Sequence, residues 1–250
     1  MATIQLAVRG DGVALVTLNA PERRNAMDLA MVGEIVAVME QLEADDVVGA
    51  VVVTGEGKGF CAGAALDHLA DPGADAKAGL RNIYAGFLAF ATCAKPTIAA
   101  VNGAAVGAGM NLALACDLRV ASTEARFDAR FLDLGLHPGG GHTWMLQRLI
   151  GPQAAAAAVL FGQSFYGAEA VRVGLAYDCV EPDQLLTRSF ELAARAASMP
   201  RELSRRTKAT FKQMWDVDNI DDAVTTELEV QAWSLQQPDF HERLAAFRKK

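Results

Sequence analysis

The sequence predicts an α/β core, a parallel sheet with covering helices, that continues into a helical C-terminal region. Between residues 4 and 121, strand-like apolar runs alternate with stretches of helical periodicity. From Pro152 onward the pattern is almost entirely helical. The chain has 250 residues, of which 52% are hydrophobic, so it can bury a sizeable core in one large domain or in a main domain with a small appendage. We therefore place the α/β core at residues 1–195 and the helical region at residues 196–250.

The first elements are expected to be a hairpin and a helix. Residues 4–8 and 13–18 are strand-like, and the glycines between them favour a turn. Asp28 can cap the helix that follows, since its apolar positions then recur at helical spacing: Leu29, Val32, Ile35, Val36, Met39 and Leu42.

Three further strands are expected, each in a continuous apolar run. Such runs, rich in β-branched residues, are typical of strands that are covered on both faces of a parallel sheet. The strands are predicted at residues 47–54, 96–102 and 118–121, with helices at 83–92 and within 106–117. The later helices are predicted at residues 154–161, 168–173, 182–197, 201–214, 220–236 and 240–250.

Charge and composition exclude several classes of partner. The net charge of −7 argues against nucleic acid or an anionic membrane as the main partner. No run approaches the roughly 18 apolar residues of a membrane span, and the first residues do not resemble a signal peptide. The four cysteines form no CxxC pair, and the four histidines form no ligand-spaced cluster with them. We expect free thiols, no metal site and a cytoplasmic location.

Two glycine-containing turns, at residues 55–64 and 102–109, each follow a predicted buried strand. A sharp strand-to-helix turn presents free backbone N–H groups at the sheet edge where α/β folds place ligands. Two such groups from different strands could stabilise negative charge on a carbonyl oxygen. The alternative is a pair of ordinary connections. Neither turn has the spacing of a phosphate loop or of a GxGxxG dinucleotide motif.

Five segments, in this order, resemble the enoyl-CoA hydratase/isomerase (crotonase) superfamily: PERRNAM at 21–27, GKGFCAGAAL at 57–66, KPTIAAVNG at 95–103, GAG at 107–109 with CDLRV at 116–120, and LGLHPGGG at 134–141. The resemblance extends to residues 174–176 and 239–247 and so covers nearly the whole chain. It implies a crotonase-like spiral of ββα units whose helical C-terminal region builds homotrimers or hexamers. It also implies a coenzyme A thioester as substrate or ligand, with no permanently bound cofactor.

The resemblance also implies where the thioester binds. The backbone N–H groups of Ala64 and Ala108 would form the oxyanion hole, although the family usually has glycine at the second position. The coenzyme A moiety would lie mainly against backbone, with a cationic side chain near the chain end, and the corresponding residues here are Arg24, Ala26, Ala62, Leu66 and Lys250. For Arg24 the alternative is a solvated surface charge.

The chain departs from the family at the residues that handle protons. Family hydratases use two glutamates, and the corresponding positions here hold Asn111 and Phe131. Asn111 could position a water molecule but cannot act as a base. Phe131 offers apolar bulk that would displace water or line an acyl pocket. Ala65 replaces the aspartate of the usual Gly-Ala-Asp.

Other titratable residues could take the acid/base role. His137 is the first candidate, because it has a suitable intrinsic pKa and its loop borders the acyl pocket of the family. Asp128 would share a face with Phe131 if a helix begins that early, whereas Asp133 would point outward on such a helix. His142 opens the next helix and could be a polar N-terminal residue. Cys61 has no identifiable base beside it, which disfavours a nucleophilic role.

The sequence thus predicts an acyl-CoA-processing lyase or isomerase of fatty acid metabolism that polarises a thioester but hydrates enoyl groups very weakly. Two alternatives stay open. One is a non-catalytic protein that binds or delivers acyl-CoA. The other is a structural role in assembly, with no affinity for acyl-CoA.

Overall fold

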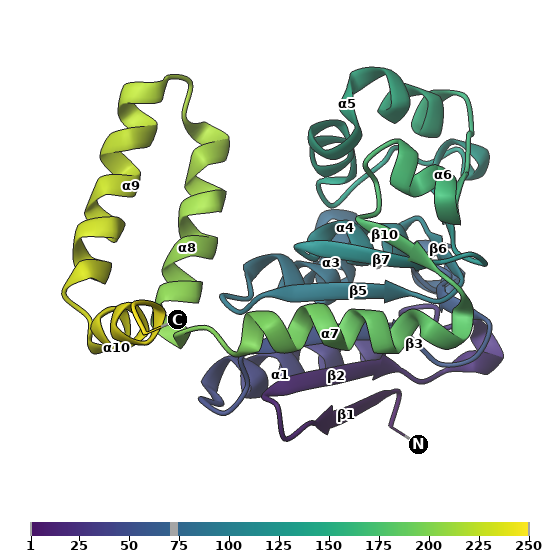
Figure 1. Ribbon diagram of the computed structural model, residues 1–250. Helices are drawn as coiled ribbons and strands as arrows, with labels where there is room; N and C mark the ends of the chain where they lie inside the picture. The colour runs from purple at the N-terminus through teal and green to yellow at the C-terminus, as the bar shows by residue number, and fades with distance from the viewer. Residues whose placement is uncertain (1, 71–74, 250) are drawn as a thin grey trace.

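The computed structural model describes residues 2–70 and 75–249 and contains two sheets (Figure 1). Within these residues the larger sheet has the strand order β1-β2-β3-β5-β7-β10, and the smaller sheet has the order β4-β6-β8-β9. The strands of the larger sheet are β1 (Ile4–Val8), β2 (Val13–Leu18), β3 (Ala50–Gly55), β5 (Thr97–Val101), β7 (Leu118–Ser122) and β10 (Asp178–Val180). Those of the smaller sheet are β4 (Gly59–Cys61), β6 (Ala104–Val106), β8 (Arg126–Asp128) and β9 (Phe165–Tyr166).

Consecutive strands are divided between the two sheets in a repeating way. In the pairs β3–β4, β5–β6 and β7–β8, the first strand joins the larger sheet and the second joins the smaller one. Both sets are parallel within their sheets. After these pairs come helices, α2 (Leu66–Ala70) with α3 (Ala76–Thr92), α4 (Ala108–Ala115) and α5 (His142–Leu160) respectively. This arrangement is the expected crotonase-like spiral of ββα units, and it confirms the predicted fold class.

The N-terminal elements follow their sequence signals. Strands β1 and β2 pair antiparallel as the predicted hairpin. Asp28 caps α1 (Leu29–Ala44), since its side chain accepts a hydrogen bond from the Met31 N–H at 2.8 Å. Most of the predicted apolar positions of α1 face the core, but Leu29 is 45% exposed because it directly follows the cap on the solvent side. Met31, which the periodicity missed, is fully buried.

Side chains on both faces of the larger sheet are buried, as the continuous apolar runs predicted. Val51 and Val53 of β3 belong to the cluster formed with α1, α3 and α4. Val52, between them, faces the opposite way and packs in the cluster of α7 (Leu185–Ala197), which crosses the front of the sheet in Figure 1. The sheet is thereby held between two helical layers.

Several predicted boundaries were wrong. Strand β3 starts at Ala50 rather than at residue 47, and Val47 is 65% exposed. Helix α3 begins seven residues earlier than predicted, because Asp75 caps it by accepting from the N–H groups of Lys77 and Ala78. The helix predicted at 154–161 is the second half of α5, which breaks at Gly151.

The region after Pro152 is less uniformly helical than the pattern indicated. The short strands β9 and β10 were not predicted, and β10 extends the larger sheet beside β7. Two or three residues are too few to show a period of alternation. Helix α6 (Gly167–Arg172) lies between them, and α7 runs through the proposed boundary at 195/196 to Ala197. That domain boundary stays a prediction.

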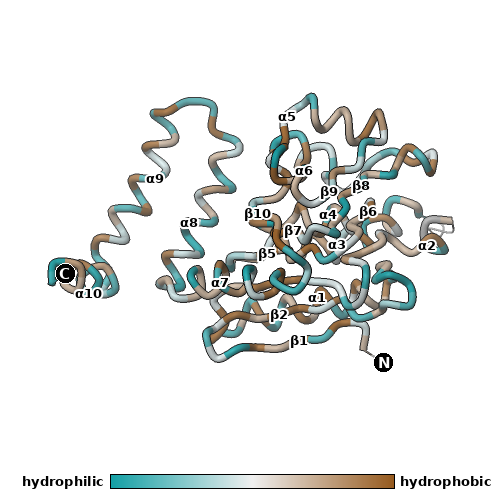
Figure 2. The backbone as a smooth tube through the Cα atoms, turned by 45° about the vertical axis from the view of Figure 1, so that its right-hand side comes forward, coloured by the Kyte–Doolittle hydropathy of each residue, from teal (hydrophilic) through white to brown (hydrophobic). Residues whose placement is uncertain are grey.

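The last three helices extend beyond the sheets. Helices α8 (Arg201–Gln213) and α9 (Ile220–Leu235) lie side by side, and α10 (Pro238–Phe247) follows them (Figure 1). Figure 2 shows single hydrophobic positions among hydrophilic ones along α8 and α9, with α9 on the side of α8 that is away from the sheets. Large apolar side chains are exposed on and around these helices, namely Phe211, Trp215, Ile220, Val224, Leu228, Leu235 and Phe247.

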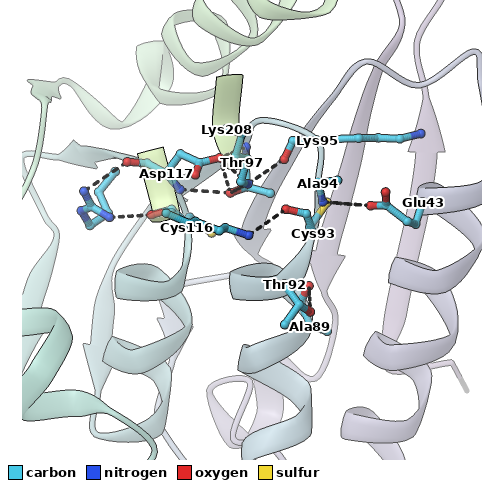
Figure 3. A network of polar contacts seen from close by, with 12 residues as sticks. Glu43, Ala89, Thr92, Cys93, Ala94, Lys95, Thr97, Cys116, Asp117 and Lys208 are labelled. Carbon is cyan, nitrogen blue, oxygen red and sulfur yellow. Dashed lines mark hydrogen bonds and ion pairs between the residues drawn. The ribbon is translucent and has the colours of Figure 1, made fainter. Parts of the chain in front are cut away.

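A polar network connects α8 to the sheet (Figure 3). Lys208 is 8% exposed, and its Nζ donates to Asp117 Oδ2 at 2.6 Å and to Lys95 O at 2.7 Å. Asp117 Oδ2 also accepts from the N–H and the hydroxyl of Thr97 at 2.8 and 3.0 Å. The buried ammonium group therefore has partners that offset its loss of hydration.

Two further observations concern the surroundings of the chain. Among the described residues, no helix combines the length and the apolar character needed to cross a membrane. All four cysteines lie in the described part of the chain and are free thiols, as predicted: Cys61, Cys93, Cys116 and Cys179.

Candidate active site

The two glycine-containing turns meet in the structure. Helix α4 packs so closely on β4 that a Cβ added to Gly109 would lie 2.1 Å from the Cys61 carbonyl oxygen. Gly63 has φ +103°, and a Cβ there would lie 2.8 Å from Val106 O and 3.6 Å from the Ala108 nitrogen. Because side chains are absent at these two positions, the backbones of the turns come into direct contact.

Two backbone N–H groups at this junction have no acceptor in the part of the chain that the structure describes. Within residues 2–70 and 75–249, neither the Ala64 nor the Ala108 nitrogen donates a hydrogen bond. Ala108 is the first residue of α4, where the helix leaves its N–H groups unpaired and carries partial positive charge. Around Ala64, the Met27 N–H donates to Gly63 O at 2.7 Å and the Ala65 N–H donates to Met27 O at 2.8 Å. These bonds fix the chain around the Ala64 N–H.

Most of the residues expected to contact the coenzyme A moiety lie in the two segments joined by these hydrogen bonds, one around Met27 and one around Ala64. Arg24 is exposed, and its carbonyl accepts from the Ala62 N–H at 2.9 Å. Ala26 and Ala62 are half-buried, and Leu66 is 64% exposed at the start of α2. The fifth expected residue, Lys250, lies outside the described residues.

Asn25, which the sequence analysis did not single out, anchors this loop. It is fully buried with φ +57°, a left-handed conformation that asparagine tolerates. Its Oδ1 accepts from the Ala20 N–H at 2.9 Å, and its Nδ2 donates to Gly59 O at 2.8 Å and Glu56 O at 3.0 Å. The long-range bonds cannot be read from the sequence, where Asn25 is one polar residue after two arginines.

Cys61 lies beside the junction but is not a reactive thiol. Its side chain is fully buried and donates to Asn25 O at 3.1 Å. Burial raises the pKa of the thiol to about 12, so the thiolate is essentially absent at neutral pH. The structure supports the packing role over the nucleophilic one.

Asn111 and His142 form a buried pair beside the junction. Asn111 lies one helical turn after Ala108 on α4, and its Nδ2 donates to Gly139 O at 3.0 Å. Its Oδ1 is 2.7 Å from His142 Nδ1. His142 is the first residue of α5, as predicted, but it is 1% exposed rather than a surface polar residue.

The second nitrogen of His142 has no partner among the described residues. Its Nε2 is buried and makes no hydrogen bond. Burial lowers the pKa of His142 to about 4, so the ring is neutral at pH 7. The Phe131 ring meets the imidazole edge-on, with 4.9 Å between the ring centroids.

Phe131 connects this pair to the junction. A Cβ added to Gly107 would be 3.9 Å from Phe131 Cζ, so the aromatic ring lies over the turn that precedes Ala108. Phe131 stands at the start of a single 3₁₀ turn, Leu132–Leu134. It is half-buried, whereas Leu132 and Leu134 are exposed.

No helix runs from Asp128 through Phe131, so the condition for Asp128 to share a helical face with Phe131 is not met. Asp128 ends strand β8, and Arg130 then takes a left-handed φ of +46°. Asp128 is buried and accepts from Arg130 Nη2 at 2.6 Å, so its carboxylate is held in an ion pair. Asp133 is exposed, as expected, although it lies in the 3₁₀ turn and not on an α-helix.

His137 lies apart from the buried pair. Its side chain is exposed, and its Nδ1 donates to the neighbouring Pro138 carbonyl at 2.7 Å. This contact satisfies the ring nitrogen through local backbone, which accounts for the histidine without a catalytic role. The assignment of His137 as acid or base stays a prediction.

Comparison with known proteins identifies the family. The model of the family described as enoyl-CoA hydratase/isomerase matches residues 9–250. The chain belongs to the enoyl-CoA hydratase/isomerase family. It is 52% identical to a probable enoyl-CoA hydratase, EchA14, of Mycobacterium tuberculosis over 94% of this chain and 93% of that protein. It is also 32% identical to a 1,2-epoxyphenylacetyl-CoA isomerase of Escherichia coli, over 96% of this chain and 93% of that one.

Solved structures agree with the family assignment. The fold matches a crystal structure of enoyl-CoA hydratase from Bacillus anthracis with a TM-score of 0.94, at 28% identity and over 99% of this chain and 96% of that chain. The match covers the helical C-terminal region as well as the sheets. Because the similar proteins include both hydratases and an isomerase, membership of the family does not determine which reaction this chain catalyses. The reaction has to be inferred from the residues of the site.

Proposed function

We propose that this protein is an enzyme of the family that binds acyl-CoA thioesters through the Ala64 and Ala108 N–H groups. The observation that carries the proposal is the meeting of the two turns, which leaves both N–H groups without an acceptor among the described residues. Donors fixed in advance stabilise an oxyanion because they need no reorganisation as charge develops on the thioester oxygen. Removal of one such donor typically costs about 10²–10³-fold in rate.

The coenzyme A moiety would lie along the paired loops beside this junction. The backbone of Arg24, Ala26 and Ala62 and the side chain of Leu66 would contact it. Lys250, which lies outside the described residues, is the candidate cation that would reach the nucleotide bound to a neighbouring subunit. The exposure of Arg24 supports this, since its guanidinium is free to reach an anion. A protein with a net charge of −7 can hold an anionic ligand through a few placed cations.

The reaction we propose is a proton transfer at the carbon next to the thioester, as in double-bond isomerisation, and not hydration. Hydration needs a base to activate water and an acid to protonate carbon, each worth about 10²–10⁴-fold. At the two positions where family hydratases place glutamates, Asn111 offers an amide oxygen that already accepts from His142, and Phe131 offers only a ring. An isomerisation needs only one group that shuttles a proton.

The proposed function also includes an oligomeric state and a cellular location. We propose that other copies of the chain cover the exposed apolar residues of α8–α10 in a homotrimer or hexamer. Sedimentation velocity should then give a mass three or six times the 26.5 kDa of one chain, and a monomer at micromolar concentration would contradict this. The free cysteines support a reducing, cytoplasmic location.

A panel of acyl-CoAs of different chain lengths, incubated with pure protein and followed by mass spectrometry and thermal shift, tests the proposed function. We expect thermal stabilisation and conversion of at least one unsaturated thioester. Stabilisation without any product would favour a binding or delivery protein. No stabilisation by any acyl-CoA would favour a role in assembly and contradict the proposal.

A further inference from the structure

His142 Nε2 is a buried polar atom without a partner in the part of the chain that the structure describes. Buried polar groups in folded proteins are almost always hydrogen-bonded, and an exception calls for a functional explanation. This exception lies beside the junction of the two turns, on a side chain that is 99% buried.

The neighbouring contacts fix which nitrogen of His142 holds the proton. Asn111 must direct its Nδ2 to the Gly139 carbonyl, because a carbonyl can only accept. Its Oδ1 therefore faces His142 Nδ1 and accepts the proton there at 2.7 Å. In the neutral ring this leaves Nε2 with a free lone pair, which is the form that can take up a proton.

The His142 imidazole lies close to the turn that presents one of the two oxyanion donors, the Ala108 N–H. Ala108 and Asn111 are separated by one turn of α4 and lie on the same side of the helix. The Phe131 ring contacts the imidazole at one side and lies over Gly107 at the other. The Phe131 side chain is thus in contact both with His142 and with the turn that presents the Ala108 N–H.

The segment that carries Phe131 lies at the surface. The residue before it, Arg130, has a positive φ, and the 3₁₀ turn after it exposes Leu132 and Leu134. Phe131 is itself only half-buried. Because the Phe131 ring contacts the imidazole and lies over Gly107, a rotation of its side chain would uncover part of His142 beside the junction.

We propose that His142 is the catalytic base of this site and that Nε2 removes a proton from the α-carbon of the bound thioester after Phe131 has turned aside for the acyl chain. The C–H bond breaks and an N–H bond forms at Nε2. The electron pair of the C–H bond moves into an enolate whose oxygen accepts from Ala64 and Ala108. The imidazolium returns the proton to the α-carbon or, in an unsaturated chain, to the γ-carbon. This proposal rests on the proposed function.

Asn111 acts here as a positioning residue. It does not touch the reacting atoms, but it holds the proton on Nδ1 and so keeps Nε2 basic. Among the described residues, the recorded contacts place near the Asn111–His142 pair Tyr84 of α3, whose hydroxyl lies near Gly139, and the ion pairs of Asp128 with Arg126 and of Arg130 with Asp128 and Asp133. Burial lowers the pKa of His142, and no charged neighbour contributes to this shift. The free lone pair, the geometry and the neutral state together support a base.

Exchange of the α-protons of hexanoyl-CoA in D₂O, measured by mass spectrometry, tests the proposal. The wild-type protein should incorporate deuterium well above the rate without protein. His142→Gln and His142→Ala should reduce this rate at least about 100-fold, the usual minimum for loss of a general base. The dissociation constant for hexanoyl-CoA, measured by calorimetry, should change less than threefold. His241→Ala, at an exposed histidine of α10, is the matched control and should exchange at the wild-type rate.

Asn111→Asp separates a catalytic from a structural role, and it keeps the side-chain volume. A carboxylate beside Nδ1 raises the pKa of His142, and since the base must be unprotonated, the low-pH limb of the pH–rate profile should move to higher pH. Binding without exchange in the wild type, or exchange that survives His142→Gln, would overturn the proposal and leave the proposed function standing. Loss of exchange in His137→Ala but not in His142→Gln would also overturn it. Absence of hexanoyl-CoA binding would instead contradict the proposed function.

Discussion

Asn111 and His142 are joined by a buried hydrogen bond of 2.7 Å between Oδ1 and Nδ1, although 31 residues separate them in the chain. Asn111 cannot act as a base, but it sets the protonation of a residue that can. The pair also lies beside the Phe131 ring. Asn111 and Phe131, the two residues expected at the glutamate positions of family hydratases, are therefore both in contact with one neutral imidazole.

The buried His142 makes stability depend on pH. Its pKa in the folded protein is about 4, below the ordinary value of 6.5, so between these values the unfolded chain binds a proton that the folded chain does not. This contribution is fully present above pH 6.5 and is lost as the pH falls to 4, by about 3 kcal/mol in all. Urea unfolding at pH 7.0 and pH 4.5 should show that the wild type loses roughly 2–3 kcal/mol more than His142→Gln does. Equal losses in the two proteins would show that the folded-state pKa of His142 is not lowered.

Gly109 is expected to be essential for the meeting of the two turns. In Gly109→Ala the new Cβ would lie 2.1 Å from Cys61 O, so the backbones must move apart. We expect a loss of about 1–3 kcal/mol in the free energy of unfolding and a clear loss of acyl-CoA affinity. The matched control is Gly33→Ala in α1, where nothing lies within 4 Å of the added Cβ. That variant should be unchanged or up to about 1 kcal/mol more stable, and its affinity for acyl-CoA should be unchanged. Wild-type affinity in Gly109→Ala would show that the contact does not shape the site.

The two positions without glutamate allow a gain of function to be sought. The double substitution Asn111→Glu with Phe131→Glu would supply both carboxylates beside the junction. Since each acid or base contributes about 10²–10⁴-fold, hydration of crotonyl-CoA should rise by at least about 10-fold, even with imperfect geometry. The single variants should give less. A folded double variant that binds crotonyl-CoA but hydrates it no faster than the wild type would contradict this account of the two positions.

The Lys208 network is expected to hold α8 against the sheet. Lys208→Met keeps most of the stem but removes the donor to Asp117 and to the Lys95 carbonyl. We expect the free energy of unfolding to fall by about 1–3 kcal/mol, because a buried acceptor loses its partner. Arg172→Ala, which removes an exposed ion pair with Glu169, should cost less than about 1 kcal/mol. Similar effects of the two substitutions, measured by chemical denaturation, would show that the network adds nothing beyond a surface pair.

Much of the fold was predictable because its signals are local. The Asp28 cap, the β1–β2 hairpin and the apolar runs of the central strands each depend on residues that are close in sequence. The smaller sheet was not predicted, because strands of two or three residues such as β9 carry no visible period. Val47 was wrongly assigned to the strand, because the sequence does not distinguish an exposed apolar residue beside a buried strand from a residue of that strand.

The candidate site was predictable to the extent that it is made of backbone. The glycines in the sequence indicate the turns around Ala64 and Ala108, and the two turns are in contact in the structure. The side-chain chemistry was less accessible. His137 and Asp128 were favoured for their place near Phe131, yet one is exposed and the other is held in an ion pair. The pairing of Asn111 with His142 spans two helices, and no local pattern indicates it.

The central claim is that this site polarises a thioester but lacks the carboxylates that hydration requires. The most direct measurement follows the conjugated-enoyl absorbance of crotonyl-CoA in the presence of pure protein, at a concentration that thermal shift shows to be saturating. We predict binding, with hydration at least about 100-fold slower than typical enzyme turnover of about 10 s⁻¹. Loss of the absorbance at an ordinary enzymatic rate would contradict the account.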